Sequence, residues 1–222
     1  IVVFYLKKIK VPDVFRSIMP IFVLPLIGTF ITAGIMMWVI GKPIANITVL
    51  LTEWLQNMSG TNTILLAVIL GMMIAFDMGG PVNKVAFSFM ILSVSEQIYT
   101  IPAMIGVAIC VPPIGLGIST LIAPKKYSDE EKETGKAAIL MGLVGVTEGA
   151  IPFAAANPLR VIPALMAGAA CGSVTAGLLG AKLSSSWGGL IVLPTVENKI
   201  GYIIAVLVGA SVTAVTAAAL KK

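Results

Sequence analysis

The sequence predicts an all-α membrane protein, a polytopic helix bundle that contains two re-entrant hairpins. Of the 222 residues, 58% are hydrophobic and 11% are charged, whereas charged residues make up about 25% of a soluble domain. The apolar runs lack strict alternation and exceed the length of a strand, which favours helices over a membrane barrel. Two further apolar stretches are short and interrupted by polar residues, and these predict the hairpins.

Basic residues predict how the chain is oriented. Residues 1–16 contain four lysines and arginines and precede an apolar run at 17–40, and residues 124–136 contain four lysines. Cytoplasmic segments carry an excess of Lys and Arg. We therefore expect a cytoplasmic lead-in at 1–16 and a cytoplasmic loop at 124–136, within a single membrane-embedded domain at 1–222.

The long apolar runs set the number of crossings. Residues 99–123, 161–181 and 200–220 are each long enough for one crossing, which needs about 20 apolar residues. Residues 17–40 would make a further crossing, so residues 1–16 and 124–136 lie on one side of the membrane if residues 63–95 enter it and return to the same face. The C-terminal Lys221 and Lys222 lie on that side as well if residues 137–160 do the same. Two full crossings in each of these segments would satisfy the same count, and an ordinary aqueous loop between tilted spans is the alternative for residues 63–95.

Residues 46–58 have apolar side chains at helical spacing and polar side chains on the other side. This pattern predicts an amphipathic helix. Two placements fit it equally: in the membrane interface with Trp54 at the headgroups, or packed against the bundle.

The first interruption reads DMGGPVNK, at residues 77–84. The apolar arms on its two sides are too short to span a membrane comfortably. A hairpin would bring Asp77, Asn83 and Lys84 near its tip. Asp77 and Lys84 could contact a ligand or could neutralise each other as an ion pair.

The second interruption reads GVTEGAIPF, at residues 145–153. Ser128 and Glu131 have the spacing of a capping box, so a helix should start near Asp129 and stop at this break. The break places Glu148 in apolar surroundings, and a charge at the bilayer centre costs about 2.5–3.5 kcal/mol on insertion scales. We expect Glu148 to face a cavity and bind a solute; the alternative is a buried Glu that pairs with Arg160 or a backbone amide.

If the two tips meet, carboxylates and amides share one volume. Such groups suit a polyhydroxylated ligand, because each hydroxyl both donates and accepts a hydrogen bond. A proton or sodium relay is the other possibility for this arrangement.

The composition excludes several functions. The chain has no histidine, which rules out a Ser-His-Asp triad and an HExxH zinc site on this chain. The net charge of +5 sits at points that flank the membrane, so no nucleic-acid binding is expected. We predict no catalytic residue, no metal site and no cofactor.

Two motifs carry a resemblance to a known family. FDMGGPVNK at residues 76–84 and GVTEGAIPFAAANPLRVIP at residues 145–163 resemble enzyme IIC, the membrane permease of the bacterial sugar phosphotransferase system, in its fructose branch. The resemblance implies a homodimer in the bacterial inner membrane that binds sugar and presents it to a phosphorylated IIB domain, whose cysteine carries the phosphoryl group. By this resemblance Glu148 holds sugar hydroxyls, and the expected binding set is Glu148, Thr147, Asp77, Asn83, Lys84, Asn157 and Arg160.

The chain departs from the family pattern at two places. Asn157 stands where the family commonly has an aspartate, and Trp187, Gly188 and Gly189 stand where it has His-Gly-Gly. The first change removes a possible partner for Arg160, and the second alters the expected outer part of the sugar path, so the sugar is not fixed as fructose. Family members usually carry further N-terminal spans and often fused IIA and IIB domains, which implies that this chain is the C-terminal portion of a longer one.

The function expected is therefore the sugar-binding, membrane-translocating subunit of a phosphotransferase-system transporter for fructose or a fructose-like sugar. Phosphoryl transfer chemistry is expected on the separate IIB domain, so whether this chain counts as an enzyme is left open. The main alternative is an ion-coupled secondary transporter of a small polar solute. A structural membrane subunit explains the two polar breaks less well.

Overall fold

A computed structural model describes residues 23–40, 50 and 63–221 of the chain. The chain divides into two compact units, Ile1–Glu53 and Trp54–Lys222. In the first unit, α2 (Leu24–Ile35) continues into the π-helix η3 (Met36–Ile40). The helix predicted at residues 17–40 is thus present from residue 24, and residues 17–22 lie outside the described part. The predicted amphipathic helix at 46–58 also lies outside it, apart from Leu50.

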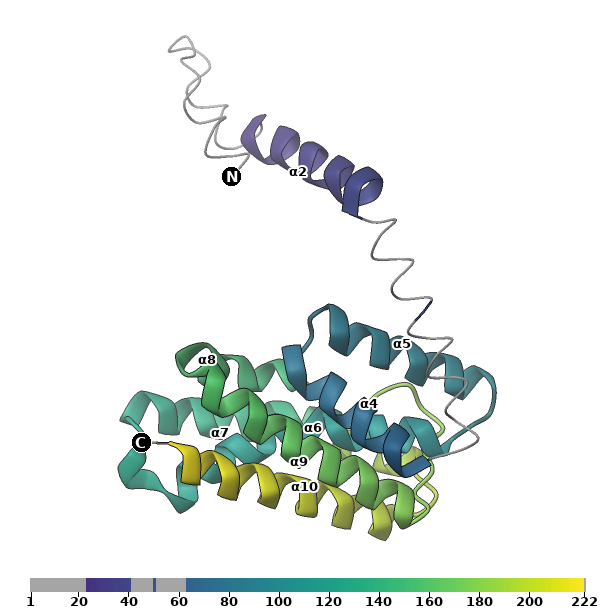
Figure 1. Cartoon of the computed structure of the whole chain (residues 1–222), viewed down its shortest axis with the longest axis vertical. Coiled ribbons are helices and arrows are strands. Elements are labelled where there is room, and N and C mark those ends of the chain that lie inside the picture. The colour runs from purple at the N-terminus through teal and green to yellow at the C-terminus, as the bar shows by residue number, and fades with distance from the viewer. Residues whose placement is uncertain (1–22, 41–49, 51–62, 222) are drawn as a thin grey trace. The chain divides into compact units, whose positions relative to one another are not determined.

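The second unit is a helix bundle without strands in its described residues, as the sequence predicted (Figure 1). Its helical elements in chain order are α4 (Thr63–Asp77), α5 (Pro81–Ser95), α6 (Thr100–Ile122), η4 (Pro124–Lys126), α7 (Asp129–Val144), η5 (Thr147–Ala150), α8 (Ile151–Ala156), α9 (Pro158–Leu178), η6 (Leu190–Thr195) and α10 (Lys199–Leu220).

The central helix is α6. It is buried along nearly its whole length and packs against α4, α5, α7, α9 and α10. Among the described helices, α6, α9 and α10 are long and apolar enough to cross a membrane. These are three of the four crossings that the sequence predicted, and their bounds differ from the predicted ones by at most three residues.

Small residues allow α4, α6, α9 and α10 to pack closely, as expected for helices in lipid. A Cβ on Gly172 of α9 would lie 2.9 Å from Val107 Cγ1 on α6, and a Cβ on Gly71 of α4 would lie 2.7 Å from the carbonyl oxygen of Ala169 on α9. Gly168, Gly172 and Gly177 of α9 all lie where an added Cβ would crowd a side chain of a neighbouring helix.

The four half-length helices form two hairpins that start from opposite ends of the bundle (Figure 1). The α4–α5 hairpin starts where Thr63 lies beside Leu178, at the C-terminal end of α9. The α7–α8 hairpin starts at Asp129, and α8 returns to the same end because the Phe153 ring packs on the Tyr127 ring with centroids 6.4 Å apart. That these hairpins re-enter a membrane remains a prediction, since the structure contains no lipid.

Two predicted boundaries were wrong by a few residues. The interruption expected at 77–84 is only Met78–Gly80, because Pro81 stands in the first turn of α5, where its missing N–H leaves no bond unmade. Asn83 and Lys84 therefore belong to the helix. For the same reason α9 begins at Pro158 rather than at residue 161.

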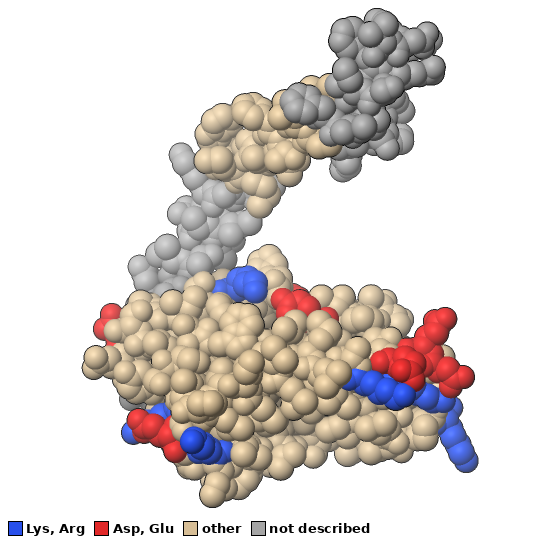
Figure 2. Space-filling model, turned by 180° about the vertical axis from the view of Figure 1, so that it is seen from behind, with Lys and Arg blue, Asp and Glu red and all other residues tan. Residues whose placement is uncertain are grey.

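Charged side chains gather mainly at the two ends of this unit, and the surface between them is largely uncharged apart from a basic and an acidic patch at its upper edge in the view (Figure 2). One end carries the Lys132–Asp129 and Lys136–Glu133 ion pairs, and the other carries the Lys182–Glu197 pair. An apolar band between two charged ends is the surface that a bilayer requires.

Candidate functional site

The tips of the two hairpins meet at Glu148 and Gly79. Gly79 has φ +106°, and a Cβ built on it would overlap Glu148 Oε1 and would lie 3.0 Å from Glu148 Cδ. The Glu148 side chain is exposed, and within the described part of the chain its carboxylate has neither a hydrogen bond nor an ion pair. The alternative of a Glu paired with Arg160 or a backbone amide is therefore wrong for this structure.

The helix that leads to Glu148 forms as the sequence predicted. Ser128 caps α7 through a capping box, in which its hydroxyl accepts the Glu131 N–H and the Glu131 carboxylate accepts the Ser128 N–H. The helix ends at Gly145, whose φ of +89° closes a Schellman motif. Gly145 N–H donates to Gly142 O at 3.0 Å and Val146 N–H to Met141 O at 2.9 Å. This motif turns the chain into η5, which carries Glu148.

Thr147 anchors the break to the central helix. It is buried, and its Oγ1 donates to the carbonyl oxygen of Ile109 at 3.1 Å. That oxygen would normally accept the N–H of residue 113, four positions further along α6, but residue 113 is a proline and has none. Pro113 thus leaves the carbonyl oxygen of Ile109 without a helix partner, and the Thr147 hydroxyl donates to it.

Asp77 caps the start of α5. Its two carboxylate oxygens accept the N–H groups of Val82 and Asn83, each at 2.8 Å, which are free donors in the first turn of the helix. It makes no ion pair with Lys84. The interpretation of Asp77 and Lys84 as a mutually neutralising pair is therefore wrong, and the carboxylate has a structural task in the turn.

Asn83 and Lys84 differ in their surroundings. Asn83 is buried, and its Nδ2 donates to Ile74 O at 2.7 Å, which joins α5 to α4. Lys84 is exposed, and its ammonium lies 5.5 Å from the centre of the Phe87 ring. Of these two predicted residues, Lys84 has the head group available to a solute.

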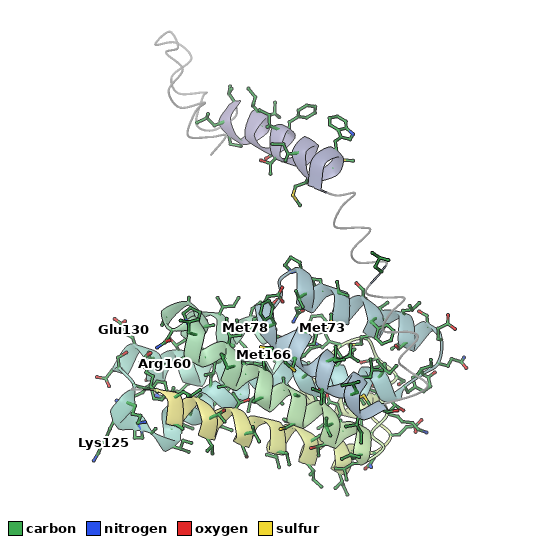
Figure 3. The ribbon with its side chains drawn as sticks, viewed as in Figure 1. Met73, Met78, Lys125, Glu130, Arg160 and Met166 are labelled. Carbon is green, nitrogen blue, oxygen red and sulfur yellow. The ribbon has the colours of Figure 1, made fainter. Side chains whose placement is uncertain are left out.

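Asn157 and Arg160 line a cavity of about 20 Å³ together with Tyr127, Glu131 and Lys221, and Glu148 does not line it. Arg160 lies toward the end of the bundle that also carries Lys125 and Glu130 (Figure 3). A cavity of this size has room for about one water molecule and none for a sugar. The structure therefore does not bring these two residues together with Glu148.

The same end has a charged network outside the membrane-spanning segments. Lys221 pairs with Glu131 and lies over the Tyr127 ring, 4.7 Å from its centre. Partial burial raises the pKa of Glu131, but hydrogen bonds from Lys221 and the Ser128 amide, with the charge of Lys221, outweigh it and leave this pKa below its ordinary value. The pKa of Asp129 is also lowered, by the hydrogen bond and charge of Lys132.

The segment at residues 187–189, which the family resemblance placed in the outer part of the sugar path, also reaches the break; its contact with the end of α7 was not predicted. Trp187 Nε1–H donates to Val144 O at 2.9 Å, at the end of α7. A Cβ on Gly189 would lie 2.5 Å from the backbone nitrogen of Gly145. The departure from the family's His-Gly-Gly marked this segment in the sequence, but it gives no information about the distant helix end that Trp187 contacts.

No group of three or more His, Cys, Asp or Glu side chains that could hold a metal occurs among the described residues. The arrangement at Glu148 offers instead a free, exposed carboxylate against the glycine turn of the other hairpin, and the exposed ammonium of Lys84 belongs to the helix that follows this turn. These groups accept and donate hydrogen bonds to hydroxyls, so the site can bind a polar, uncharged solute.

Comparisons with known proteins agree with this chemistry. Residues 1–168 match the family described as "Phosphotransferase system, EIIC". The chain is 62% identical over 221 residues to the "Fructose-like permease IIC component 2" of Escherichia coli K12, covering 100% of this chain and 62% of that protein. It is 42% identical over 222 residues to the "PTS system fructose-specific EIIC component" of Haloferax volcanii, covering 100% of this chain and 59% of that protein.

A longer relative is the "PTS system fructose-specific EIIABC component" of Bacillus subtilis, which is 38% identical over 223 residues, covering 100% of this chain and 35% of that protein. The chain therefore spans less than two thirds of the length of all three relatives. No solved structure gives a significant match. The comparisons give no support to an ion-coupled transporter.

Proposed function

The chain belongs to the EIIC family of the phosphotransferase system, and from that membership we propose that it is the sugar-binding, membrane-translocating part of a transporter for fructose or a fructose-like sugar. The names of its relatives, which are fructose-specific or fructose-like, support this choice of sugar. The departures at Asn157 and Trp187 leave related hexoses as the competing substrates.

The observation that carries the proposal is the free carboxylate of Glu148 where the two hairpin tips meet. A carboxylate at membrane depth without an ion pair is costly unless a ligand or water satisfies it. Two carboxylate oxygens can accept hydrogen bonds from a pair of adjacent sugar hydroxyls. In this proposal Glu148 binds the sugar, Lys84 approaches it from α5, and Thr147 holds the break in place.

The remaining predicted residues take supporting parts. Asp77 and Asn83 hold the turn of the α4–α5 hairpin through the bonds to Val82 and Ile74. Asn157 and Arg160 line a small cavity on the side of the lysine-rich loop. We propose that these two residues act on the path by which sugar leaves toward the cytoplasm rather than at Glu148.

The phosphoryl group is proposed to come from a separate phosphorylated IIB domain on the cytoplasmic side. Relatives named EIIB'BC and EIIABC support an association with such a domain. Phosphorylation would give the sugar a charge and so prevent its return through the apolar bundle. We further propose that the protein is a multi-pass homodimer in the bacterial inner membrane.

Uptake of labelled fructose into vesicles that contain the full-length protein tests this function. Transport is expected with phosphorylated IIB and not without it. Glu148→Gln should abolish sugar binding without lowering Tm, while the matched change Glu96→Gln, at an exposed Glu at the end of α5, should leave binding intact. Wild-type uptake by the Glu148→Gln protein, or uptake driven by an ion gradient without IIB, would overturn the proposal.

A further inference from the structure

Trp187 contacts both hairpins near the point where their tips meet. Its indole N–H bonds to Val144 O at the end of α7, and its ring packs edge to face on Phe87 of α5, with ring centres 6.1 Å apart and planes at 87°. The residue itself belongs to a third segment, the loop that leads to η6. One side chain therefore links three parts of the chain that are distant in sequence.

The hydrogen bond satisfies an acceptor that the helix itself leaves free. The last carbonyls of a helix have no partner inside it, and the Schellman motif at Gly145 uses only those of Met141 and Gly142. Val144 O lies four residues before Glu148, at the last residue of α7. The Trp187 N–H thus stabilises the conformation of the backbone that carries Glu148.

The loop is itself held in place, so the indole has a fixed position. Gly189 N–H donates to Gly106 O at 3.3 Å, and the buried Tyr202 hydroxyl donates to Gly189 O at 3.1 Å. A Cβ on Gly188 would lie 2.7 Å from Gly106 O. The loop that carries Trp187 is thus bonded to α6 and α10, two of the long helices, while the indole reaches both half-length hairpins.

We propose that Trp187 is a positioning residue for sugar binding, which holds the α7 break and α5 in register so that the Glu148 carboxylate stays against Gly79. This inference rests on the proposed function of Glu148. Trp187 acts through the backbone at Val144 and through Phe87, and not by touching the sugar.

The test is a double-mutant cycle on fructose affinity, measured by equilibrium binding to the full-length protein. Trp187→Phe keeps an aromatic ring and removes the N–H, so Kd should rise about 2- to 10-fold, the effect of one hydrogen bond. Glu148→Asp shortens the carboxylate and is expected to retain weak binding. If Trp187 acts by placing the Glu148 carboxylate, Trp187→Phe should have much less effect in the Glu148→Asp protein than in the wild type.

Each outcome decides the inference. An equal loss in both backgrounds, or no loss in the wild type, would overturn it. Trp38→Phe is the control, because Trp38 is an exposed tryptophan of the other unit, and it should leave Kd unchanged. If Trp187→Phe does not fold, Phe87→Leu removes the ring contact from the other side and enters the same cycle. A wild-type protein that binds no sugar would contradict the proposed function rather than the role of Trp187.

Discussion

The carboxylate of Glu148 lies directly against Gly79, at a turn whose positive φ suits glycine. Glu148 comes from the α7–α8 hairpin and Gly79 from the α4–α5 hairpin, and these hairpins start from opposite ends of the bundle. The contact therefore places a free acidic group against a glycine turn, at the point where the two hairpins meet. This is the arrangement from which the proposed sugar site follows.

We predict that Gly79→Ala both destabilises the protein and weakens sugar binding. A left-handed φ costs a residue with a Cβ about 1–2 kcal/mol, and here the added Cβ would also displace the Glu148 carboxylate. Tm in detergent should fall, and fructose affinity should fall by about tenfold or more, which corresponds to about 1.4 kcal/mol.

Gly180→Ala is the matched control for that change. Gly180 also has a positive φ, +63°, but nothing lies within 4 Å of the position that a Cβ would take. It should lower Tm by the conformational cost alone and leave fructose affinity unchanged. Equal losses of affinity in the two variants would show that the contact between Gly79 and Glu148 has no role in binding.

Most of the architecture could be predicted from the sequence, because it depends on local signals. The lengths of the apolar runs gave α6, α9 and α10, and the capping box at Ser128 and Glu131 gave the start of α7. The errors at Pro81 and Pro158 had one cause. A proline in the first turn of a helix was interpreted as part of a break, although its missing N–H is harmless there.

The candidate site was only partly predictable, because its contacts join segments far apart in the chain. The two polar breaks were recognisable by composition, and Glu148 was found in this way. The sequence did not reveal which of these polar groups already have partners within the protein. The Asp77 carboxylate accepts the N–H groups of Val82 and Asn83, and the Thr147 hydroxyl donates to Ile109 O. The contact of Trp187 with Val144, across 43 positions, has no local signature.

Thr147→Val should destabilise the protein by about 1–3 kcal/mol, the cost of leaving a buried carbonyl without a partner. The substitution keeps the shape of the side chain and removes the donor to Ile109 O. Because Pro113 is the reason that this oxygen is free, Pro113→Ala would supply an N–H within α6. The free energy of unfolding, measured for both single variants and the double variant, should therefore show that Thr147→Val costs less in the Pro113→Ala background.

Thr175→Val serves as the control for Thr147→Val. Thr175 Oγ1 donates to Cys171 O at 2.7 Å within α9, where the helix's own N–H also bonds to that oxygen. Removing the Thr175 hydroxyl should change the free energy of unfolding by about 0.5 kcal/mol or less. A cost for Thr147→Val that is the same with and without Pro113 would contradict the proposed link between the proline and the hydroxyl.

Stability should depend on pH through Glu131. Its pKa in the folded protein is lower than its ordinary value of 4.5, so folding favours the ionised form. The resulting stabilisation is fully present above the unfolded pKa and is lost as the pH falls through the folded one. The difference in unfolding free energy between wild type and Glu131→Gln should therefore be constant near neutral pH and shrink below about pH 4.5.

Glu133→Gln removes an exposed ion pair with Lys136 at the same end, and its effect should be small at every pH, because such pairs contribute about 0–1 kcal/mol. A Glu131→Gln difference that stays constant down to low pH would contradict a lowered pKa. Lys221→Met removes two of the three effects that lower the Glu131 pKa and leaves burial, which raises it, against the smaller effect of the Ser128 amide. The contribution of Glu131 to the pH dependence should therefore be lost or reversed in that variant.

Asp77→Asn should affect stability and leave sugar binding almost unchanged, because the Asp77 carboxylate caps α5 whereas the Glu148 carboxylate is the proposed sugar ligand. Asparagine offers one acceptor oxygen where Asp77 offers two, so one of the N–H groups of Val82 and Asn83 loses its partner, at a cost of about 1 kcal/mol in stability. Fructose affinity should change by no more than about twofold, because the carboxylate is already occupied by these amides. Glu148→Gln should give the opposite result, with Tm retained and affinity lost. Parallel measurements of Tm and Kd on the two variants test this, and a loss of affinity in Asp77→Asn without a loss of Tm would make Asp77 a sugar ligand instead.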